Sequence, residues 1–205
     1  YHLTDWCAFS TKDMETWTEH PTPLKSTDFA WNVTNDAWAA HVTERDGKYY
    51  YYISTSGAGI GVAVSDRPQG PYKDALGKPL LTKDDCEGAD HGWVCIDPAV
   101  FIDDDGRAYL FWGNKGLWYG ELNDDMISFK NGYKEVPGFH DAASFGPKMM
   151  KMNWGKGKEE LMVGFEEGPW ISKRGDIYYL TYPAGGVPEH MAYSTAPTID
   201  GPWTY

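Results

Sequence analysis

Residues 96–113 constrain the fold of this chain most strongly, because they contain a complete β-hairpin signal. Two apolar runs, Ala99–Ile102 and Ala108–Trp112, flank an Asp-Asp-Asp-Gly turn. Short runs of β-branched and aromatic residues around an Asp-Gly turn are typical of paired antiparallel strands. Pro98 cannot donate a ladder hydrogen bond, so the first strand is expected to begin there. Asp97 is therefore an acid at the mouth of an apolar strand, which makes it a candidate functional residue.

The same plan of strand, Asp-Gly or Gly turn, aromatic strand and further strand occurs four times along the chain. The copy at residues 1–17 is partial, the second spans 37–74, and the fourth begins near Glu167 and ends at 201–203. Repeated short antiparallel strands predict a propeller, sandwich or solenoid. The aromatic strands and the absence of a long helical period favour an all-β propeller with about four strands per blade. Further strands are expected at 49–53, 60–65, 117–122, 126–129, 177–182 and 191–194.

Composition limits the classes of partner. The 205 residues suffice for a single domain, which is expected to span 1–205. A net charge of -12 argues against nucleic acid, which requires a basic face. The sequence contains no apolar run of about 18 residues, so no membrane span is predicted. It also contains no residue spacing typical of a metal-ligand set. Cys86 and Cys95 form one bridge or, with Cys7, remain free thiols, and both alternatives stay open.

The repeat also predicts where functional side chains gather. In a propeller the first strand of each blade lines the central axis, so residues that begin these strands converge at one end. These residues are Asp97, Glu167 and, in the second segment, Asp36 or Trp38. Two carboxylates in a funnel rimmed by aromatic residues are the arrangement of glycoside hydrolysis. One of the acids must stay protonated in order to donate to the leaving oxygen.

Five residues are candidates for substrate binding, each with a structural alternative. Trp38 stacks on a sugar ring or packs between blades, and Trp170 has the same two roles open to it. Asp36 binds a sugar hydroxyl or stabilises a turn. His41 lies on an inner strand, as a ligand-binding or a structural histidine. His190 faces the pocket or a seam between blades.

The chain resembles the family-43 glycoside hydrolases along nearly its whole length. Residues 9–17, FSTKDMETW, are similar to the SSKDLxxW edge of the first blade of that family. Residues 37–41 are similar to its WAP motif, with Ala40 in place of Pro. The other matching stretches are IGVAVSDRPQGPY at 60–72, IDP at 96–98 with DDDGRAYLFWG after it, and EGP at 167–169.

This resemblance implies a five-bladed propeller, of which the chain covers the end of blade 1 through blade 4. It implies inverting hydrolysis of xylosyl or α-L-arabinofuranosyl linkages in xylan, arabinoxylan or arabinan. Glu167 would be the general acid, and Asp97 would modulate its pKa. The general base of the family is an Asp at the start of blade 1. That position precedes Tyr1, and Asp5 does not match the motif, so the base and the fifth blade are expected outside this chain.

The alternative function is a carbohydrate-binding propeller fragment that is catalytically incomplete. A propeller for protein docking is disfavoured, because the inner-strand acids differ in type and spacing. The expected ligand is a pentose-containing oligo- or polysaccharide. Open blade edges predict self-association. The resemblance allows a central calcium ion, although the sequence requires no cofactor. A polymeric substrate implies an extracellular or periplasmic location.

Overall fold

The computed structural model describes residues 2–86, 93–147, 164–185 and 188–205. These residues are almost entirely β-structure, with short helical turns at η1 (Ser26–Asp28), η2 (Lys83–Asp85) and α1 (Ala142–Phe145). The strands are β1 (Asp5–Trp6), β2 (Phe9–Thr11), β3 (Trp17–Glu19), β4 (Leu24–Lys25), β5 (Ala40–Arg45), β6 (Lys48–Thr55), β7 (Gly59–Ser65), β8 (Lys73–Asp74), β9 (Ala99–Ile102), β10 (Ala108–Trp112), β11 (Trp118–Leu122), β12 (Lys134–Glu135), β13 (Trp170–Arg174), β14 (Ile177–Ala184) and β15 (His190–Ala196).

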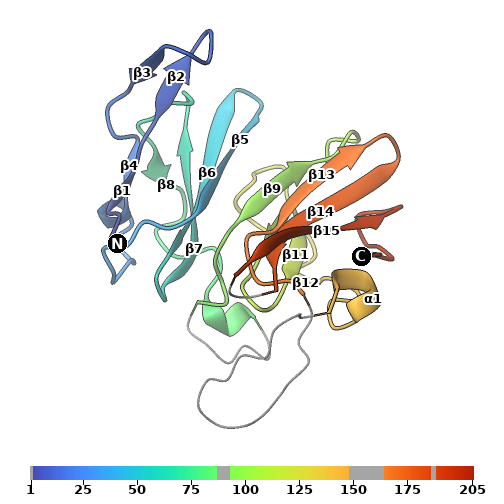
Figure 1. Ribbon diagram of the computed structural model, residues 1–205. Helices are drawn as coiled ribbons and strands as arrows, with labels where there is room; N and C mark the ends of the chain where they lie inside the picture. The colour runs from blue at the N-terminus through green and yellow to red at the C-terminus, as the bar shows by residue number, and fades with distance from the viewer. Residues whose placement is uncertain (1, 87–92, 148–163, 186–187) are drawn as a thin grey trace.

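The sheets are successive blades of a propeller (Figure 1). The pairs β1–β4 and β2–β3 belong to blade 1, and the sheet β5-β6-β7-β8 is blade 2. Blade 3 is β9-β10-β11-β12 and blade 4 is β13-β14-β15, all antiparallel. The inner strand β9 contacts both β5 and β13, so the inner strands of three blades lie side by side. This arrangement confirms the predicted all-β propeller and brings the starts of the inner strands to one end.

Blade 3 shows how far local pattern determines the strands. Strands β9 and β10 have the predicted bounds, and Phe111 pairs with Ala99 across the hairpin. The strand predicted at 126–129 is wrong. The Asp125 carboxylate instead accepts from the Ile127 N–H and the Ser128 hydroxyl, which folds this segment into a turn. The fourth strand of the blade is β12, which pairs with β11.

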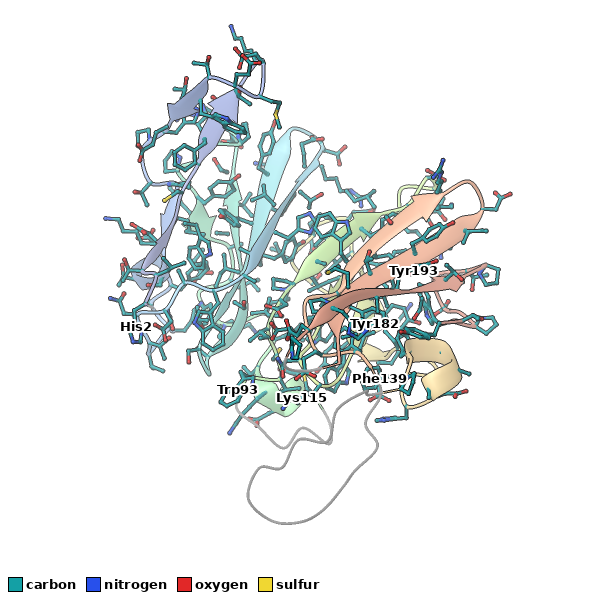
Figure 2. All side chains as sticks on the ribbon, viewed as in Figure 1. His2, Trp93, Lys115, Phe139, Tyr182 and Tyr193 are labelled. Carbon is teal, nitrogen blue, oxygen red and sulfur yellow. The ribbon has the colours of Figure 1, made fainter. Side chains whose placement is uncertain are left out.

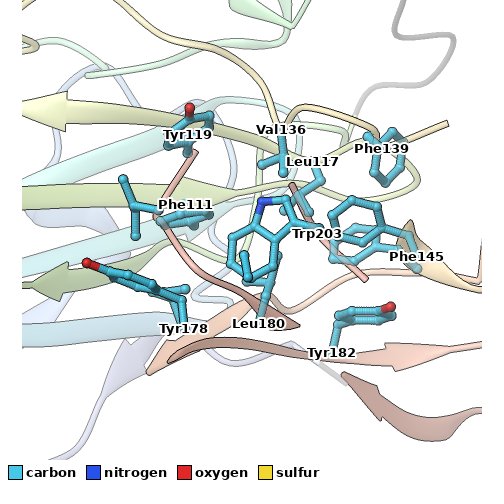
Figure 3. Close-up of a cluster of buried hydrophobic side chains, with 14 of the residues drawn as sticks. Phe111, Leu117, Tyr119, Val136, Phe139, Phe145, Tyr178, Leu180, Tyr182 and Trp203 are labelled. Carbon is cyan, nitrogen blue, oxygen red and sulfur yellow. The ribbon is translucent and has the colours of Figure 1, made fainter. Parts of the chain in front are cut away.

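Aromatic side chains fill the interface between blades 3 and 4 (Figure 3). Phe111 on β10 and Leu180 and Tyr182 on β14 are fully buried there. Phe145 of α1 and Trp203 close the same cluster. Because adjacent blades share this close-packed core, the relative placement of their inner strands is fixed by packing.

A buried ion pair also joins these two blades. The Asp103 side chain, only 3% exposed, lies 2.8 Å from Lys173 Nζ and accepts a hydrogen bond from the Tyr178 hydroxyl. Burial opposes ionisation of Asp103, but its hydrogen bonds to Lys173 and Tyr178 outweigh burial and lower its pKa. The acid of the hairpin turn in blade 3 thus binds side chains about 70 residues further along the chain, on β13 and β14.

Replacing Asp103 with Ala is expected to lower the free energy of unfolding by about 2 kcal/mol, because Tyr178 and Lys173 lose their acceptor. Asp104→Ala is the matched control. Its carboxylate also contacts Lys173, at 2.9 Å, but it is 86% exposed, so a loss below about 0.5 kcal/mol is expected. Urea unfolding at pH 7 measures both variants. Equal losses would show that the buried pair contributes no more than the exposed one.

One face of blade 4 is apolar and exposed. It carries Trp170, Ile177, Met191 and Tyr193, whose exposed fractions lie between 45% and 70%. Alternation along the strands explains this face, because the opposite side chains pack on blade 3. Self-association through such surfaces stays a prediction. Sedimentation velocity of the 205-residue chain would test it, and a monomer across the accessible concentrations would contradict it.

For the cysteines, the structure selects one of the two alternatives that the sequence leaves open. All three cysteines are free thiols, with Cys7 exposed and Cys86 and Cys95 buried. The Cys86 sulfur accepts a hydrogen bond from Trp112 Nε1 at 3.4 Å. Among the helices of the described residues, none is long and apolar enough to cross a membrane.

Candidate active site

A cavity of about 800 Å³ opens at the end of the blades where the inner strands begin. Both predicted acids, Asp97 and Glu167, lie in its wall. The other lining residues are mostly apolar and aromatic, and they are Leu3, Trp6, Ala37, Trp38, Ala39, Ala40, Tyr51, Trp93, Ile96 and Asn114. A concave apolar site with a few convergent polar groups is suited to a small ligand or to sugar units of a polymer.

Asp97 lies two residues before β9, in an unusual backbone conformation. Its φ is 58°, in the left-handed region that Asp tolerates better than most residues. Pro98 follows it and restricts the backbone further. The Asp97 carboxylate accepts the Gly168 N–H at 3.0 Å, which links blade 3 to the Glu167 segment. Strained conformations of this kind cluster at functional sites.

The electrostatics of Asp97 are those of an acid that stays protonated near neutrality. Burial, followed by the negative charge of Glu167, raises the pKa of Asp97 from 3.8 to about 7. The hydrogen bond from the Gly168 N–H opposes this shift but does not cancel it. Two neighbouring carboxylates with one raised pKa can hold and pass a proton at neutral pH.

The segment that carries Glu167 is fixed by two backbone hydrogen bonds of the preceding residue, Glu166. The Glu166 N–H donates to the Pro183 carbonyl at 2.9 Å, and the Lys115 N–H donates to the Glu166 carbonyl at 2.7 Å. Glu166 itself is buried, whereas Glu167 lines the cavity. A hydrogen bond of 2.7 Å from Asn114 Nδ2 holds the Glu167 carboxyl at Oε2. The structure thus presents Glu167, the acid chosen from the sequence, to the cavity.

Trp38 is the one predicted substrate-binding residue that the described structure places in the cavity wall. Its backbone is held at both polar groups. The Trp38 N–H donates to the Ser54 carbonyl at 3.0 Å, and the Trp38 carbonyl accepts from Trp6 Nε1 at 2.7 Å. A fixed backbone beside the two acids gives this indole a suitable position for stacking on a sugar ring.

The other four predicted binding residues do not line the cavity as the described residues define it. Asp36 accepts a hydrogen bond of 2.7 Å from His2 Nδ1. His190 is exposed and packs over Gly185, at the end of β14.

His41 and Trp170 contact each other between blades. Their rings stack with centroids 4.9 Å apart. His41 Nδ1 accepts from the Val100 N–H at 2.9 Å, a role open to a neutral ring, and burial lowers the pKa of His41. These contacts correspond to the structural alternative for His41, because its imidazole joins β5 to β9.

Sequence reasoning missed Asn114 and Trp93, which line the cavity beside the acids. Figure 2 shows Trp93 and Lys115 at the end of the blades where the inner strands begin. The signal for Asn114 was available in the hairpin itself. Because β9 and β10 are antiparallel, the residues just after β10 return to the end where Asp97 precedes β9. The Gly113 N–H, accordingly, donates to the Ile96 carbonyl at 3.0 Å.

The described residues do not supply a side-chain cluster for the calcium ion that the resemblance allows. Within the described ranges, no three His, Cys, Asp or Glu side chains come together as a metal-ligand set. The donors at the cavity are instead two carboxylates and an amide, from Asp97, Glu167 and Asn114. Two carboxyl groups and an amide in this arrangement can transfer a proton and hydrogen-bond sugar hydroxyls.

Comparison with known proteins relates this chain to a family of enzymes. The profile of Glycosyl hydrolases family 43 matches residues 2–205. The β-D-galactofuranosidase xynD of Aspergillus niger is 36% identical over 96% of this chain and 54% of its own length. Xylosidase/arabinosidase 43A of Humicola insolens is 30% identical over 100% of this chain and 68% of its own length.

Solved structures agree with the sequence relatives. An α-L-arabinofuranosidase from Clostridium thermocellum superposes with a TM-score of 0.78 at 28% identity. The match covers 100% of this chain and 62% of that one, so the chain spans somewhat over half of several of the proteins that it resembles. Its sheets correspond to part of the five-bladed propeller of these enzymes, from the end of blade 1 through blade 4. With a profile match over residues 2–205, the chain belongs to glycosyl hydrolases family 43.

Proposed function

We propose that this chain carries the proton-donating half of an inverting glycosidase site. The observation that carries the proposal is the shared cavity of Asp97 and Glu167, in which the Glu167 charge helps to raise the pKa of Asp97 to about 7. The proton that the two carboxyls share near neutrality passes to Glu167, which gives it to the glycosidic oxygen as the bond to the anomeric carbon breaks. Asp97 regulates the charge beside this donor, and Trp38 packs on the sugar.

The proposed substrates are xylosyl and α-L-arabinofuranosyl units of xylan, arabinoxylan or arabinan. The names of the relatives support this range, since they include a xylosidase/arabinosidase and an α-L-arabinofuranosidase. The relative named as a β-D-galactofuranosidase adds a furanoside whose ring stereochemistry matches that of α-L-arabinofuranose. The apolar wall at Trp38, Trp93 and Tyr51 suits the faces of such sugars. We propose that this action takes place outside the cell or in the periplasm, because the proposed substrate is a plant polymer, and cell fractionation would test this.

The test of the proposed function uses the protein expressed from its full coding sequence. Hydrolysis of 4-nitrophenyl β-D-xylopyranoside, α-L-arabinofuranoside and β-D-galactofuranoside is measured, and proton NMR identifies the anomer released first. We expect turnover of at least one pentoside with inversion at the anomeric carbon. Retention would contradict the mechanism. Saturable sugar binding without turnover would favour the carbohydrate-binding alternative, in which the cavity holds but does not cleave.

A further inference from the structure

We propose that Asn114 is a positioning residue, which holds the Glu167 carboxyl in both of its protonation states during proton transfer. This inference rests on the proposed function and deepens it. The contact is direct, because Asn114 Nδ2 lies 2.7 Å from Glu167 Oε2. Hydrogen bonds to a charged oxygen are short and strong, and this one fixes the carboxyl at the cavity wall.

The turn that carries Asn114 is bonded to both acid-bearing segments. Its backbone donates to the blade 3 segment before Asp97, from Gly113 to Ile96 and from Asn114 to Val94, at 3.0 and 3.2 Å. The Lys115 N–H donates to the carbonyl of Glu166, one residue before Glu167, at 2.7 Å. The backbone at Asn114 is therefore fixed to both acid-bearing segments, and its short side chain reaches Glu167 from there.

The side-chain oxygen of Asn114 is in an unusual environment. Asn114 is only 6% exposed, and its Oδ1 is buried without a hydrogen-bond partner among the described residues. Buried polar atoms are normally paired, and an exception calls for an explanation. An amide with a purely structural role would be expected to satisfy both of its ends. The unpaired oxygen is instead available to accept a hydrogen bond when Glu167 becomes protonated.

The two ends of the amide match the two states of a general acid. In the structure Nδ2 donates to Glu167 Oε2, which is the hydrogen bond that an ionised carboxyl needs. A protonated Glu167 has an O–H to donate, and a half-turn of the amide presents Oδ1 to it. In the reaction, the Glu167 proton moves to the glycosidic oxygen and the bond from that oxygen to the anomeric carbon breaks. Water adds its hydroxyl to that carbon and gives its proton to the general base. Asn114 keeps a partner for Glu167 before and after this transfer.

The test compares two leaving groups on the same sugar, in the protein expressed from its full coding sequence. The methanol of a methyl pentoside needs a donated proton in order to leave, whereas the 2,4-dinitrophenolate of a 2,4-dinitrophenyl pentoside leaves without one. For Asn114→Ala we expect kcat/KM to fall by roughly 30-fold or more on the methyl pentoside and by less than about 3-fold on the dinitrophenyl pentoside. Lys115→Arg, a change at the next residue that keeps its charge, is the control and should match wild type on both.

A second variant separates positioning from folding. Asn114→Asp has the same shape, but its carboxylate opposes ionisation of Glu167, so the alkaline limb of the pH–rate profile should move up by about one pH unit. Equal losses on both leaving groups with an unmoved alkaline limb would overturn the inference, as would an Asn114→Ala enzyme with wild-type rates. If wild type hydrolyses neither pentoside, the proposed function fails first. Failure of the Asn114 inference is seen only in an active wild-type enzyme.

Discussion

Glu167→Gln lowers kcat/KM for an unactivated pentoside by about 10³-fold in our expectation, because glutamine has no proton to give the leaving oxygen. The fold should be unaffected, since the carboxamide keeps an oxygen and can still pair with Asn114. On a 2,4-dinitrophenyl pentoside the loss should be below about 10-fold, because that leaving group departs as a stable anion. Steady-state kinetics on the two substrates measure the difference directly.

The matched control for this variant is Glu189→Gln. Glu189 does not line the cavity as described, but burial and the charges of Glu167 and Glu166 raise its pKa, so it lies within their electrostatic field. This control removes a nearby negative charge without removing the proposed donor, and we expect rates within about 3-fold of wild type. If Glu189→Gln and Glu167→Gln lose the same activity on the same substrates, the field and not the proton of Glu167 is the cause.

Asp97→Asn has the second large expected effect, on both rate and stability. Loss of the ionisable group should lower kcat by about 10²-fold, since Glu167 loses the neighbour that tunes it. Asparagine keeps an oxygen that can accept the Gly168 N–H, so the link between blades 3 and 4 is retained. A variant with wild-type kcat at every pH would rule out the role of Asp97 in regulating the donor.

The stability effect follows from the raised pKa of Asp97. The native protein holds this proton up to a pKa of about 7, whereas the unfolded chain releases it near 3.8. Between these pH values the native state binds more protons, so the free energy of unfolding falls as pH rises. One pKa unit corresponds to about 1.4 kcal/mol, and partial exposure of Asp97 reduces the total, so we expect a loss of about 2 to 4 kcal/mol between pH 4 and pH 8.

Asp97→Asn lacks this titration, so its stability relative to wild type should rise by that amount over the same interval. Urea unfolding at pH 4 and pH 8 measures the gap. Asp46→Asn, at a side chain that is 93% exposed, should show no such change and is the control. In a Glu167→Gln background the gap should shrink, because the Glu167 charge is the second cause of the raised pKa. An unchanging gap in the Asp97→Asn series would mean that Asp97 is ionised in the native state at pH 4 to 8.

The sequence by itself determined the hairpin of blade 3 and the main aromatic strands, and it predicted that the two acids meet. Alternation and Asp-Gly turns act over a few residues, so β9 and β10 could be placed to the residue. The repeat made the acids before β9 and β13 converge, since a propeller collects its inner strands around one axis. Local pattern failed at 126–129, where the Asp125 carboxylate makes a turn of a segment with strand-forming residues.

Only the tertiary structure decided which side chains meet across blades. Nothing near His41 in the chain predicts its stack on Trp170, and nothing near Asp103 predicts Lys173 as its partner. The same holds for Asn114, which reaches Glu167 across 53 residues of sequence. Periodicity tells which face a side chain occupies. Its partner, however, is chosen by the packing of the neighbouring blade, because contacts between blades join residues whose separation in the chain leaves no local pattern to read.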